Sequence, residues 1–298
     1  MAGAGAVRLR MGGVVAAAFL LLAIAGCTLS DAPILEPGGP IARAERDMLF
    51  RALAIMLVVV VPVFVLAFWF TWRYRASRAE GRYEPNWMSR TVDAVTWIVP
   101  ALIVIALGVH LWINTHAYDP YKPLAVAGEP LEVQVVAQDW KWLFIYPAEG
   151  VASVNELAFP AGAPLSLKIT SDTVMNSFFI PALGGQIYAM AGMQTQLNLI
   201  ADAPGRFTGR NMQYSGDGFA DQQFAAVAMS SEDFEAWVAA ARQSPETLDA
   251  ATYAALAKPS IAHPVGYYAS FEPQLFERII ERYRGGLAAE SAHEAAAR

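Results

Sequence analysis

The chain has 298 residues, of which 55% are hydrophobic and only 16% are charged, and its mean hydropathy is +0.33. This composition is too apolar for an ordinary soluble domain and indicates a protein with both membrane and globular parts. The net charge of −6 argues against a nucleic-acid partner, because there is no basic excess to neutralise phosphates. Cys27 is the only cysteine, which excludes an intrachain disulfide.

The first segment has the features of a secretory signal. Arg8 and Arg10 form a basic head, an apolar stretch covers 14–25, and small residues precede Cys27. The pattern resembles the bacterial lipoprotein signal, in which the cut falls before the cysteine that then carries lipid. We therefore expect residues 1–26 to be removed and Cys27 to be acylated, for example with palmitate. The alternative is an incidental cysteine after an ordinary signal.

After a short outer segment, 27–47, two apolar runs predict a transmembrane hairpin over 48–118. The first run, 52–72, has no charged residue and would reach roughly 31 Å as a helix, about one hydrocarbon thickness. The second covers about 94–114, and interfacial tryptophans bracket it. Buried core helices are the alternative, but the length and the flanking residues favour membrane spans.

The connection between the two runs, 73–91, is rich in arginine and has only two acidic residues, Glu80 and Glu84. Such an excess of positive charge places a short loop in the cytoplasm. Both ends of the mature chain would then lie outside the membrane, which agrees with a lipid-bearing Cys27 on the outer face.

The composition changes after about residue 119 to short alternating or valine-rich runs separated by glycine and proline. These runs predict strands at 131–138, 142–146, 165–170, 195–200 and 225–229. Their spacing indicates an all-β sandwich or small barrel over 119–230. A capping pattern at Ser230 and Asp233 predicts a helix, with further helices at 248–258 and 274–283, in a C-terminal helical extension over 231–285. The tail, 286–298, is expected to be disordered.

Several motifs resemble subunit II of the haem–copper oxidases, over 27 to about 285. They are Trp97–Pro100, Thr115–Pro120, Gln138–Trp142, Val154–Pro160, Met175–Pro181 and Gln186–Met193. The last two are close to the ubiquinol oxidase branch, the cytochrome o type. The resemblance implies a cupredoxin-like β-sandwich after the two spans.

The sequence departs from the copper-binding branch of that family at every ligand position. The resemblance places the lost copper-ligand positions at Asn176, Asn211, Gln213, Ser215, Phe219 and Gln222. Cupredoxin-type copper sites use a thiolate and imidazoles. No cysteine follows Cys27, and no histidine occurs between 120 and 262. We therefore expect no metal in this domain, and Met190, Met193 and Met229 are expected to pack in the sandwich core.

The resemblance implies a structural and assembly subunit of a proton-pumping ubiquinol oxidase in a bacterial inner membrane. Subunits I, III and IV, ubiquinol and membrane lipid are the implied partners, and the haems and remaining copper are expected in subunit I. The chain alone has no visible catalytic residue. The rivals are a copper-bearing cytochrome c oxidase subunit II and a free-standing periplasmic binding lipoprotein.

A few single residues have two interpretations each. Asp93, at the cytoplasmic start of the second span, either assists proton entry, as the resemblance implies, or is an acid favoured by the helix dipole. Trp140 matches an aromatic position that copper-bearing relatives use for electron entry, and without copper we expect packing or subunit contact. His110 and His116 are expected to lie at the outer interface.

Overall fold

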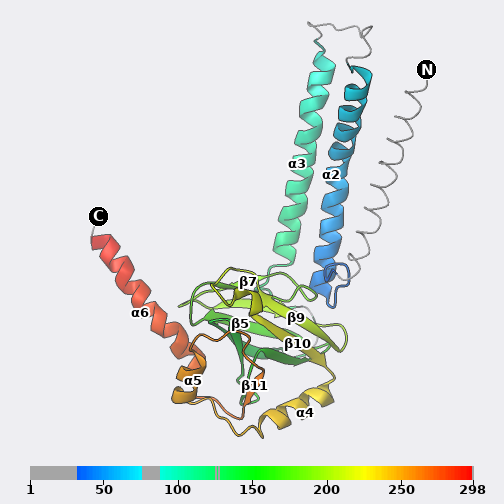
Figure 1. Ribbon diagram of the computed structural model, residues 1–298. Helices are drawn as coiled ribbons and strands as arrows, with labels where there is room; N and C mark the ends of the chain where they lie inside the picture. Colours follow the sequence, from blue (N-terminus) through cyan, green and yellow to red (C-terminus); the bar gives the residue numbers. More distant parts are fainter. Residues whose placement is uncertain (1–31, 76–87, 125, 127, 297–298) are drawn as a thin grey trace, which may run out of the picture.

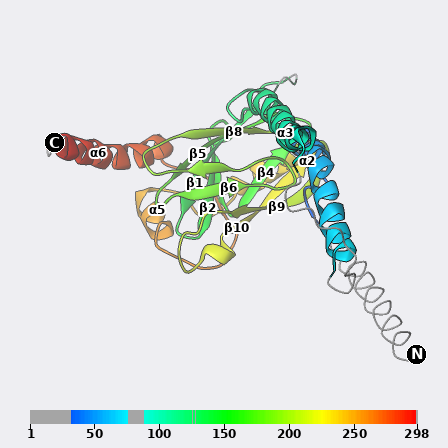
Figure 2. The same ribbon diagram turned by 90° about the horizontal axis from the view of Figure 1, so that it is seen from above.

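The computed structural model describes residues 32–75, 88–124, 126 and 128–296, with side chains as far as residue 285. Two long helices stand on one side of a β-sandwich, and a third long helix leaves the sandwich elsewhere (Figure 1). Seen from above, the paired helices and the last helix lie at opposite sides of the sandwich (Figure 2). Cys27 and most of the predicted cytoplasmic loop lie outside the described residues.

The two predicted spans are helices α2 (Pro40–Arg73) and α3 (Arg90–Ala117), and both are long and apolar enough to cross a membrane. Their apolar side chains are exposed in the isolated chain, as lipid-facing or partner-facing residues would be. The helix that contains the first predicted span, 52–72, begins well before it, at Pro40. Proline suits the first helical position, and no helix breaker follows before the apolar run.

The start of α2 is attached directly to the outer domain. The Gly38 carbonyl accepts the Asp202 N–H at 2.8 Å, and Arg43 forms an ion pair with the Asp202 carboxylate. A Cβ at Gly39 would lie 2.2 Å from the carbonyl oxygen of Ile200, so only glycine permits this approach. The domain is therefore fixed to α2 as well as to α3.

The second attachment is the segment that follows α3. Asn198 Nδ2 donates to the carbonyls of Pro120 and Lys122 at 2.9 and 3.1 Å. Two connections at separate points restrict the orientation of the outer domain relative to the helices.

The outer domain consists of two facing sheets, as predicted. The strands are β1 (Leu131–Gln138), β2 (Lys141–Tyr146), β3 (Val151–Val154), β4 (Glu156–Pro160), β5 (Leu165–Ser171), β6 (Asn176–Phe179), β7 (Ile187–Ala189), β8 (Thr195–Leu199), β9 (Gly205–Asn211), β10 (Gln223–Met229) and β11 (Gly266–Tyr268). Sheet A has the order β11-β3-β2-β1-β5-β8, and sheet B has the order β4-β10-β9-β6-β7. The β1–β5 and β4–β10 pairs are parallel, and the other pairs are antiparallel.

Aromatic side chains fill the space between the sheets. The rings of Phe178 and Phe224 stack with centroids 5.0 Å apart, and Trp142 meets Phe178 edge-on at 5.3 Å. All three side chains are buried. Aromatic pairs with this geometry contribute stability in addition to that gained from burying their surface. These rings belong to the main apolar core of the sandwich.

The extension contains α4 (Ser231–Ala241), α5 (Ala250–Leu256), β11 and α6 (Leu275–Ala296). β11 is the edge strand of sheet A, and α4 packs against the core between the sheets. α5 and the first part of α6 form a second layer over sheet A. Strand β2 is buried on both faces, because Leu143 and Ile145 pack against Phe276 and Ile279 of α6. A near-continuous apolar strand such as β2 is typical of a sheet that is covered on both sides.

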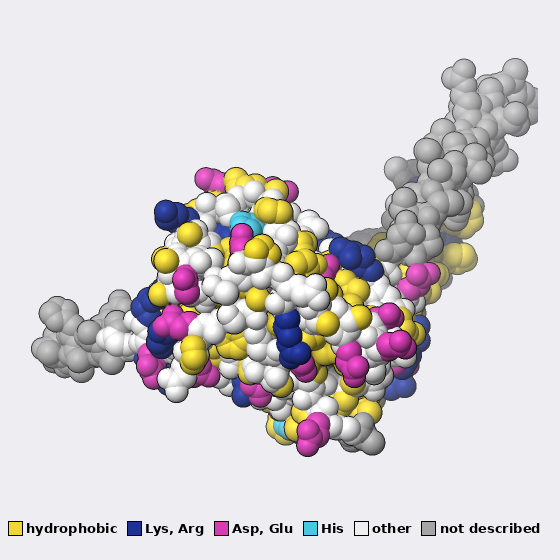
Figure 3. Space-filling model, turned by 90° about the horizontal axis from the view of Figure 1, so that it is seen from below, with side chains coloured by type: hydrophobic (Ala, Val, Ile, Leu, Met, Phe, Trp, Pro, Cys, Tyr) yellow, Lys and Arg dark blue, Asp and Glu magenta, His cyan; other side chains and the backbone are white. Residues whose placement is uncertain are grey.

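The extension has the predicted helix cap at its start. Ser230 Oγ accepts the Asp233 N–H at 3.1 Å, so the predicted cap of α4 is present. The described backbone of α6 continues to Ala296, and the disordered tail over 286–298 stays a prediction. Alanine and glutamate are strong helix formers, which favours this continuation. On the face turned away from the spans, acidic and basic side chains are interspersed with apolar ones (Figure 3).

Candidate functional site

Four of the six predicted ligand positions come together in one buried cluster. Asn176 begins β6, Asn211 ends β9, Ser215 lies in the following loop, and Gln222 comes just before β10. These four side chains are termed the amide cluster. Asn176, Asn211 and Gln222 are at most 3% exposed and Ser215 is half-buried, so the centre of the cluster is shielded from water.

Asn211 is the centre of the amide cluster. Its Nδ2 lies 2.7 Å from Asn176 Oδ1, 2.8 Å from Gln222 Oε1 and 3.1 Å from Ser215 Oγ. Its Oδ1 accepts the backbone N–H groups of Ser177 and Gln213 at 2.8 and 3.0 Å. One side chain therefore cross-links two strands and the loop between β9 and β10.

The other members extend the network to the surrounding backbone. Asn176 Nδ2 donates to the Val174 carbonyl at 2.8 Å, and Ser215 Oγ donates to Gln222 Oε1 at 3.0 Å. Gln222 Nε2 donates to the Gln138 carbonyl at the end of β1, at 3.3 Å. A buried polar network of this kind is stable only when its members are paired, as they are here.

The remaining two predicted positions do not join the amide cluster through their side chains. Gln213 contributes its backbone N–H only. Phe219 begins the short 3-10 helix η2 (Phe219–Asp221), and its ring packs 5.7 Å from that of Tyr214. Neither side chain contributes a donor or acceptor to the network.

Trp140 lies against the loop between β9 and β10. Its Nε1 donates to the Ser215 carbonyl at 3.0 Å, and its ring is so close to Gly218 that a Cβ there would lie 2.4 Å from Cδ2. Trp140 has a φ of 64°, an unfavourable backbone conformation for a bulky residue. These contacts agree with the predicted packing role of Trp140.

The donor atoms of the amide cluster do not fit copper. Soft copper sites need thiolate or imidazole, whereas this network contains neutral amides and one hydroxyl. The oxygen of Asn211 already accepts two backbone N–H groups, and that of Gln222 accepts two side-chain donors. Within the described part of the chain, no group of three or more His, Cys, Asp or Glu residues could hold a metal ion.

The three methionines differ in their environment. Met229 is half-buried and packs against the sandwich core, as predicted. The prediction was wrong for Met193, which is 49% exposed in the turn before β8. Thr170 Oγ1 donates to the backbone carbonyls of Met190 and Met193, so these residues contribute backbone contacts.

The single residues considered for function lie on or near α3. Asp93 is exposed in the first turn of α3, where Ser89 is the N-cap. At the other end, Asn114 Nδ2 donates to the His110 carbonyl at 2.7 Å, and the His116 ring packs 4.3 Å from Trp112. These positions agree with the predicted ends of the span but assign no role to the side chains.

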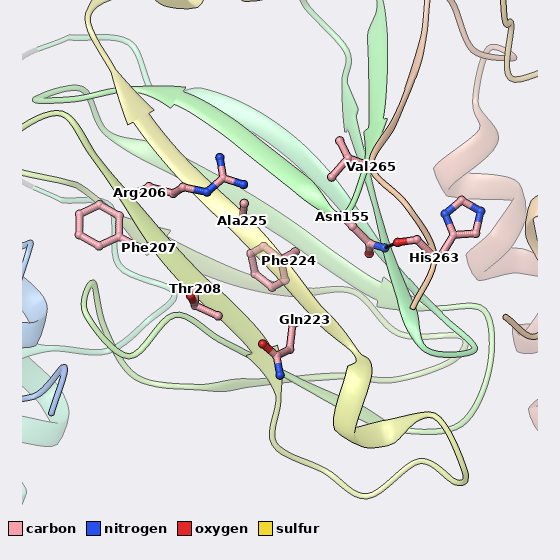
Figure 4. A pocket seen from close by; sticks show the side chains of 9 residues that line it. All are labelled: Asn155, Arg206, Phe207, Thr208, Gln223, Phe224, Ala225, His263 and Val265. Atoms are coloured by element: carbon pink, nitrogen blue, oxygen red, sulfur yellow. Dashed lines mark hydrogen bonds between the residues drawn. The ribbon is translucent and has the colours of Figure 1, made fainter. Parts of the chain in front are cut away.

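A separate shallow groove of about 400 Å³ lies beside β9 and β10 (Figure 4). Arg206, Gln223, Asn155 and His263 supply its polar lining, while Phe207 and Val265 add apolar surface. At the rim of this groove, Asn155 Nδ2 donates a hydrogen bond to the His263 carbonyl. The members of the amide cluster do not line this groove, so the two features are distinct.

Comparison with known proteins gives two family matches along the chain. Residues 102–221 match the family described as cytochrome c oxidase subunit II, periplasmic domain. Residues 242–286 match the family described as COX aromatic rich motif. The first match includes Asn176, Asn211 and Ser215 of the amide cluster and ends just before Gln222. The second includes α5, β11 and the first part of α6.

Whole-chain relatives decide the assignment. The chain is 47% identical to cytochrome bo(3) ubiquinol oxidase subunit 2 of Pseudomonas putida, over 93% of this chain and 87% of the relative. It is 45% identical to ubiquinol oxidase subunit 2 of Acetobacter aceti, over 93% and 89%. The chain belongs to the subunit II family of haem–copper oxidases, in its ubiquinol oxidase branch. As a subunit II, it is one component of a multi-subunit oxidase.

A solved structure of another oxidase subunit II also aligns with the outer domain. The periplasmic domain of cytochrome oxidase subunit II of Bradyrhizobium japonicum aligns with 39% of this chain and 95% of its own length. The sequence identity is 24% and the TM-score is 0.37.

Proposed function

We propose that this chain is the structural, copper-free subunit of a proton-pumping ubiquinol oxidase in a bacterial inner membrane. The observation that carries the proposal is the amide cluster, in which neutral hydrogen-bonding groups occupy four of the positions matched to copper ligands. A set of paired amides has no soft donor for copper and no means of accepting an electron. The outer domain therefore holds the complex together rather than conducting charge.

The electron donor follows from this role. A water-soluble carrier such as cytochrome c needs a redox centre on the outer domain. A quinol instead dissolves in the membrane and reaches the large subunit directly, where the family resemblance places the haems and the remaining copper. Subunits I, III and IV are the proposed partners, and α2 and α3 offer the exposed apolar surfaces for them and for lipid.

Oxygen consumption by the purified complex tests this proposal. We expect ubiquinol to support rapid oxygen reduction and reduced cytochrome c to support none above the rate without enzyme. A cytochrome c-dependent rate that is saturable would show that the copper-bearing alternative is right. A chain that purifies alone, without haem-bearing subunits, would instead indicate a free-standing lipoprotein.

We also propose that Cys27 carries the lipid that anchors the mature N-terminus on the periplasmic face. The support is the sequence pattern around the sole cysteine. Intact-mass analysis should give a chain that begins at Cys27 and carries acyl groups. A chain that begins at Met1 without modification would contradict this.

For Asp93 we propose a part in proton entry. Its exposed position at the start of α3 would let it face a partner subunit. Asp93→Asn should slow turnover in the assembled oxidase, whereas Asp47→Asn, at the exposed outer end of α2, should not. Equal turnover in both variants would leave Asp93 as a helix-terminal acid only.

A further inference from the structure

The extension makes hydrogen bonds to several segments at one end of the sandwich. Strand register defines this end: Gln138 pairs with Lys141 across the β1–β2 turn, and Ala137 pairs with Ser171 at the end of β5. The amide cluster lies at the same end, because Gln222 donates to the Gln138 carbonyl. The segments that form this cluster end are 138–141, 155, 171–176, 190–193 and 211–222.

Asp172 is the main point of contact between the extension and the cluster end. Its carboxylate is 3% exposed and accepts the Tyr253 hydroxyl at 2.5 Å and the Arg282 guanidinium at 2.9 Å. Tyr283 donates its hydroxyl to the Asp172 carbonyl at 2.9 Å. Burial and the nearby Asp172 raise the pKa of Tyr253, so its hydroxyl remains a donor at neutral pH.

Three more hydrogen bonds join the extension to other segments of the cluster end. They run from Lys141 Nζ to the Lys258 carbonyl at 2.8 Å, from Asn155 Nδ2 to the His263 carbonyl at 2.8 Å, and from Arg284 Nε to the Gly192 carbonyl at 3.2 Å. Lys141 is fully buried. A buried ammonium is costly unless it is hydrogen-bonded. The extension supplies one acceptor to Lys141 Nζ, and the Asp139 carbonyl supplies another at 3.1 Å.

The segments so contacted are connections between strands, which the sandwich itself supports mainly through side chains: Thr170 and Ser171 at the end of β5 and Asn176 at the start of β6 bond their backbone. Residues 172–175 and 190–193 connect strands, and β7, which lies between them in the chain, has only three residues. Segments with few backbone pairs and exposed apolar side chains open easily in folded proteins. Val174, Met175 and Met193 are such side chains, each more than 40% exposed.

We infer that the C-terminal extension holds the cluster end of the sandwich in place, chiefly through Asp172, and so keeps the loops around the amide cluster ordered. This assigns a positioning role to the aromatic-rich segment 242–286. The inference does not depend on which electron donor the oxidase uses. It also explains why the extension is polar where it meets these loops but apolar over the centre of sheet A.

Hydrogen exchange of the assembled oxidase, followed by mass spectrometry, tests the inference. Arg282→Gln should make the amides of 171–176 exchange about tenfold faster, because a hydrogen bond between two charged groups is lost. Exchange in 190–193 should also be faster, because Ala191 is bridged to Ser171. Peptides from β9 and β10 report on the rest of the domain and should change less than about twofold.

Arg278→Gln is the matched control. Arg278 also lies on α6 in an ion pair, but its partner, Glu272, belongs to the extension itself. Tyr253→Phe removes a single hydroxyl from Asp172 and should give a smaller increase in the same peptides. Exchange in 171–176 and 190–193 that is no faster in Arg282→Gln or Tyr253→Phe than in Arg278→Gln would overturn the inference.

Discussion

The apolar core and the amide cluster of the outer domain are neighbours that are stabilised in different ways. Phe178 and Phe224 of the core lie two residues along the chain from Asn176 and Gln222 of the cluster. The core gains from removing aromatic surface from water, which requires no particular partner chemistry. The cluster gains only about 1 kcal/mol from each hydrogen bond, but leaving one of its groups unpaired is costly.

This difference explains how the fold can tolerate the loss of copper that we propose. The sandwich is maintained by the core, which lies between the sheets and contains no ligand position. The cluster end needs groups that satisfy one another, and neutral amides do so without burying charge. The metal site can therefore be replaced while the fold is retained.

The largest effect should come from the core. Phe224→Ala removes a ring that contacts both Trp142 and Phe178, and we expect a loss of about 3–5 kcal/mol in the free energy of unfolding. The midpoint temperature at which subunit II unfolds within the oxidase, followed through its peptides, should fall by about 10 °C. Phe219→Ala is the control: it removes the same side chain from a half-exposed position at the start of η2 and should change stability by less than about 0.5 kcal/mol. Similar shifts in both variants would contradict the comparison.

An intermediate effect is expected in the amide cluster. Asn211→Leu keeps a side chain of similar size but leaves several buried donors and acceptors unpaired, which should cost about 2–3 kcal/mol. Gln213→Leu changes a neighbouring amide whose side chain is outside the network and should have little effect. The same unfolding measurement distinguishes them. A neutral Asn211→Leu would mean that the hydrogen bonds of the cluster contribute nothing to stability.

The smallest effect concerns Glu156, which accepts hydrogen bonds from the Tyr267 hydroxyl at 2.6 Å and from Trp237 Nε1 at 3.1 Å. Burial and the Glu156 carboxylate raise the pKa of Tyr267 to about 12, above its ordinary value of about 10. Because the pKa of Tyr267 is higher in the folded chain than in the unfolded chain, its protonation stabilises the fold. This contribution is fully present below pH ~10, the unfolded pKa, and is lost as the pH rises through about 12, the folded pKa.

Glu156→Gln keeps an oxygen acceptor but removes the negative charge. We expect the pKa of Tyr267 to fall toward 10 and the unfolding free energy to drop by about 1 kcal/mol or less. Ultraviolet difference titration of tyrosine measures the pKa of Tyr267. Comparison with Tyr267→Phe identifies which part of the signal comes from this residue. An unchanged titration of Tyr267 would mean that Glu156 does not influence it.

Part of this architecture was accessible from the sequence. The alternation in 131–138, 165–170 and 195–200 predicted β1, β5 and β8, because one face of each strand is apolar. Strand β9 was missed because its two glycines and two arginines give no such pattern. It forms through pairing with β10 and β6, which is a tertiary effect. The run 142–146 predicted a strand. Because the run is apolar without alternation, it also indicated that a second layer would cover the other face of this strand, and this indication was not used.

The site was predictable in composition but not in arrangement. The family resemblance identified the six positions, and donor chemistry alone predicted that they would not suit copper. The convergence of Asn176, Asn211, Ser215 and Gln222 on one network depends on how β6 packs beside the stretch 211–222, which local patterns do not encode. Asp172 gave no signal either, because an aspartate in a loop is usually exposed, whereas this carboxylate is covered by α5 and α6.

Copper binding by the purified oxidase tests the central claim most directly. The complex would be equilibrated with cupric ion, freed of loosely bound metal, and analysed for retained copper and for a thiolate–copper absorption band. We expect no such band and the same copper content in wild type and in Asn211→Leu. Additional copper that is retained by the wild-type complex and lost in Asn211→Leu would contradict the account, because the amide cluster would then be a metal site.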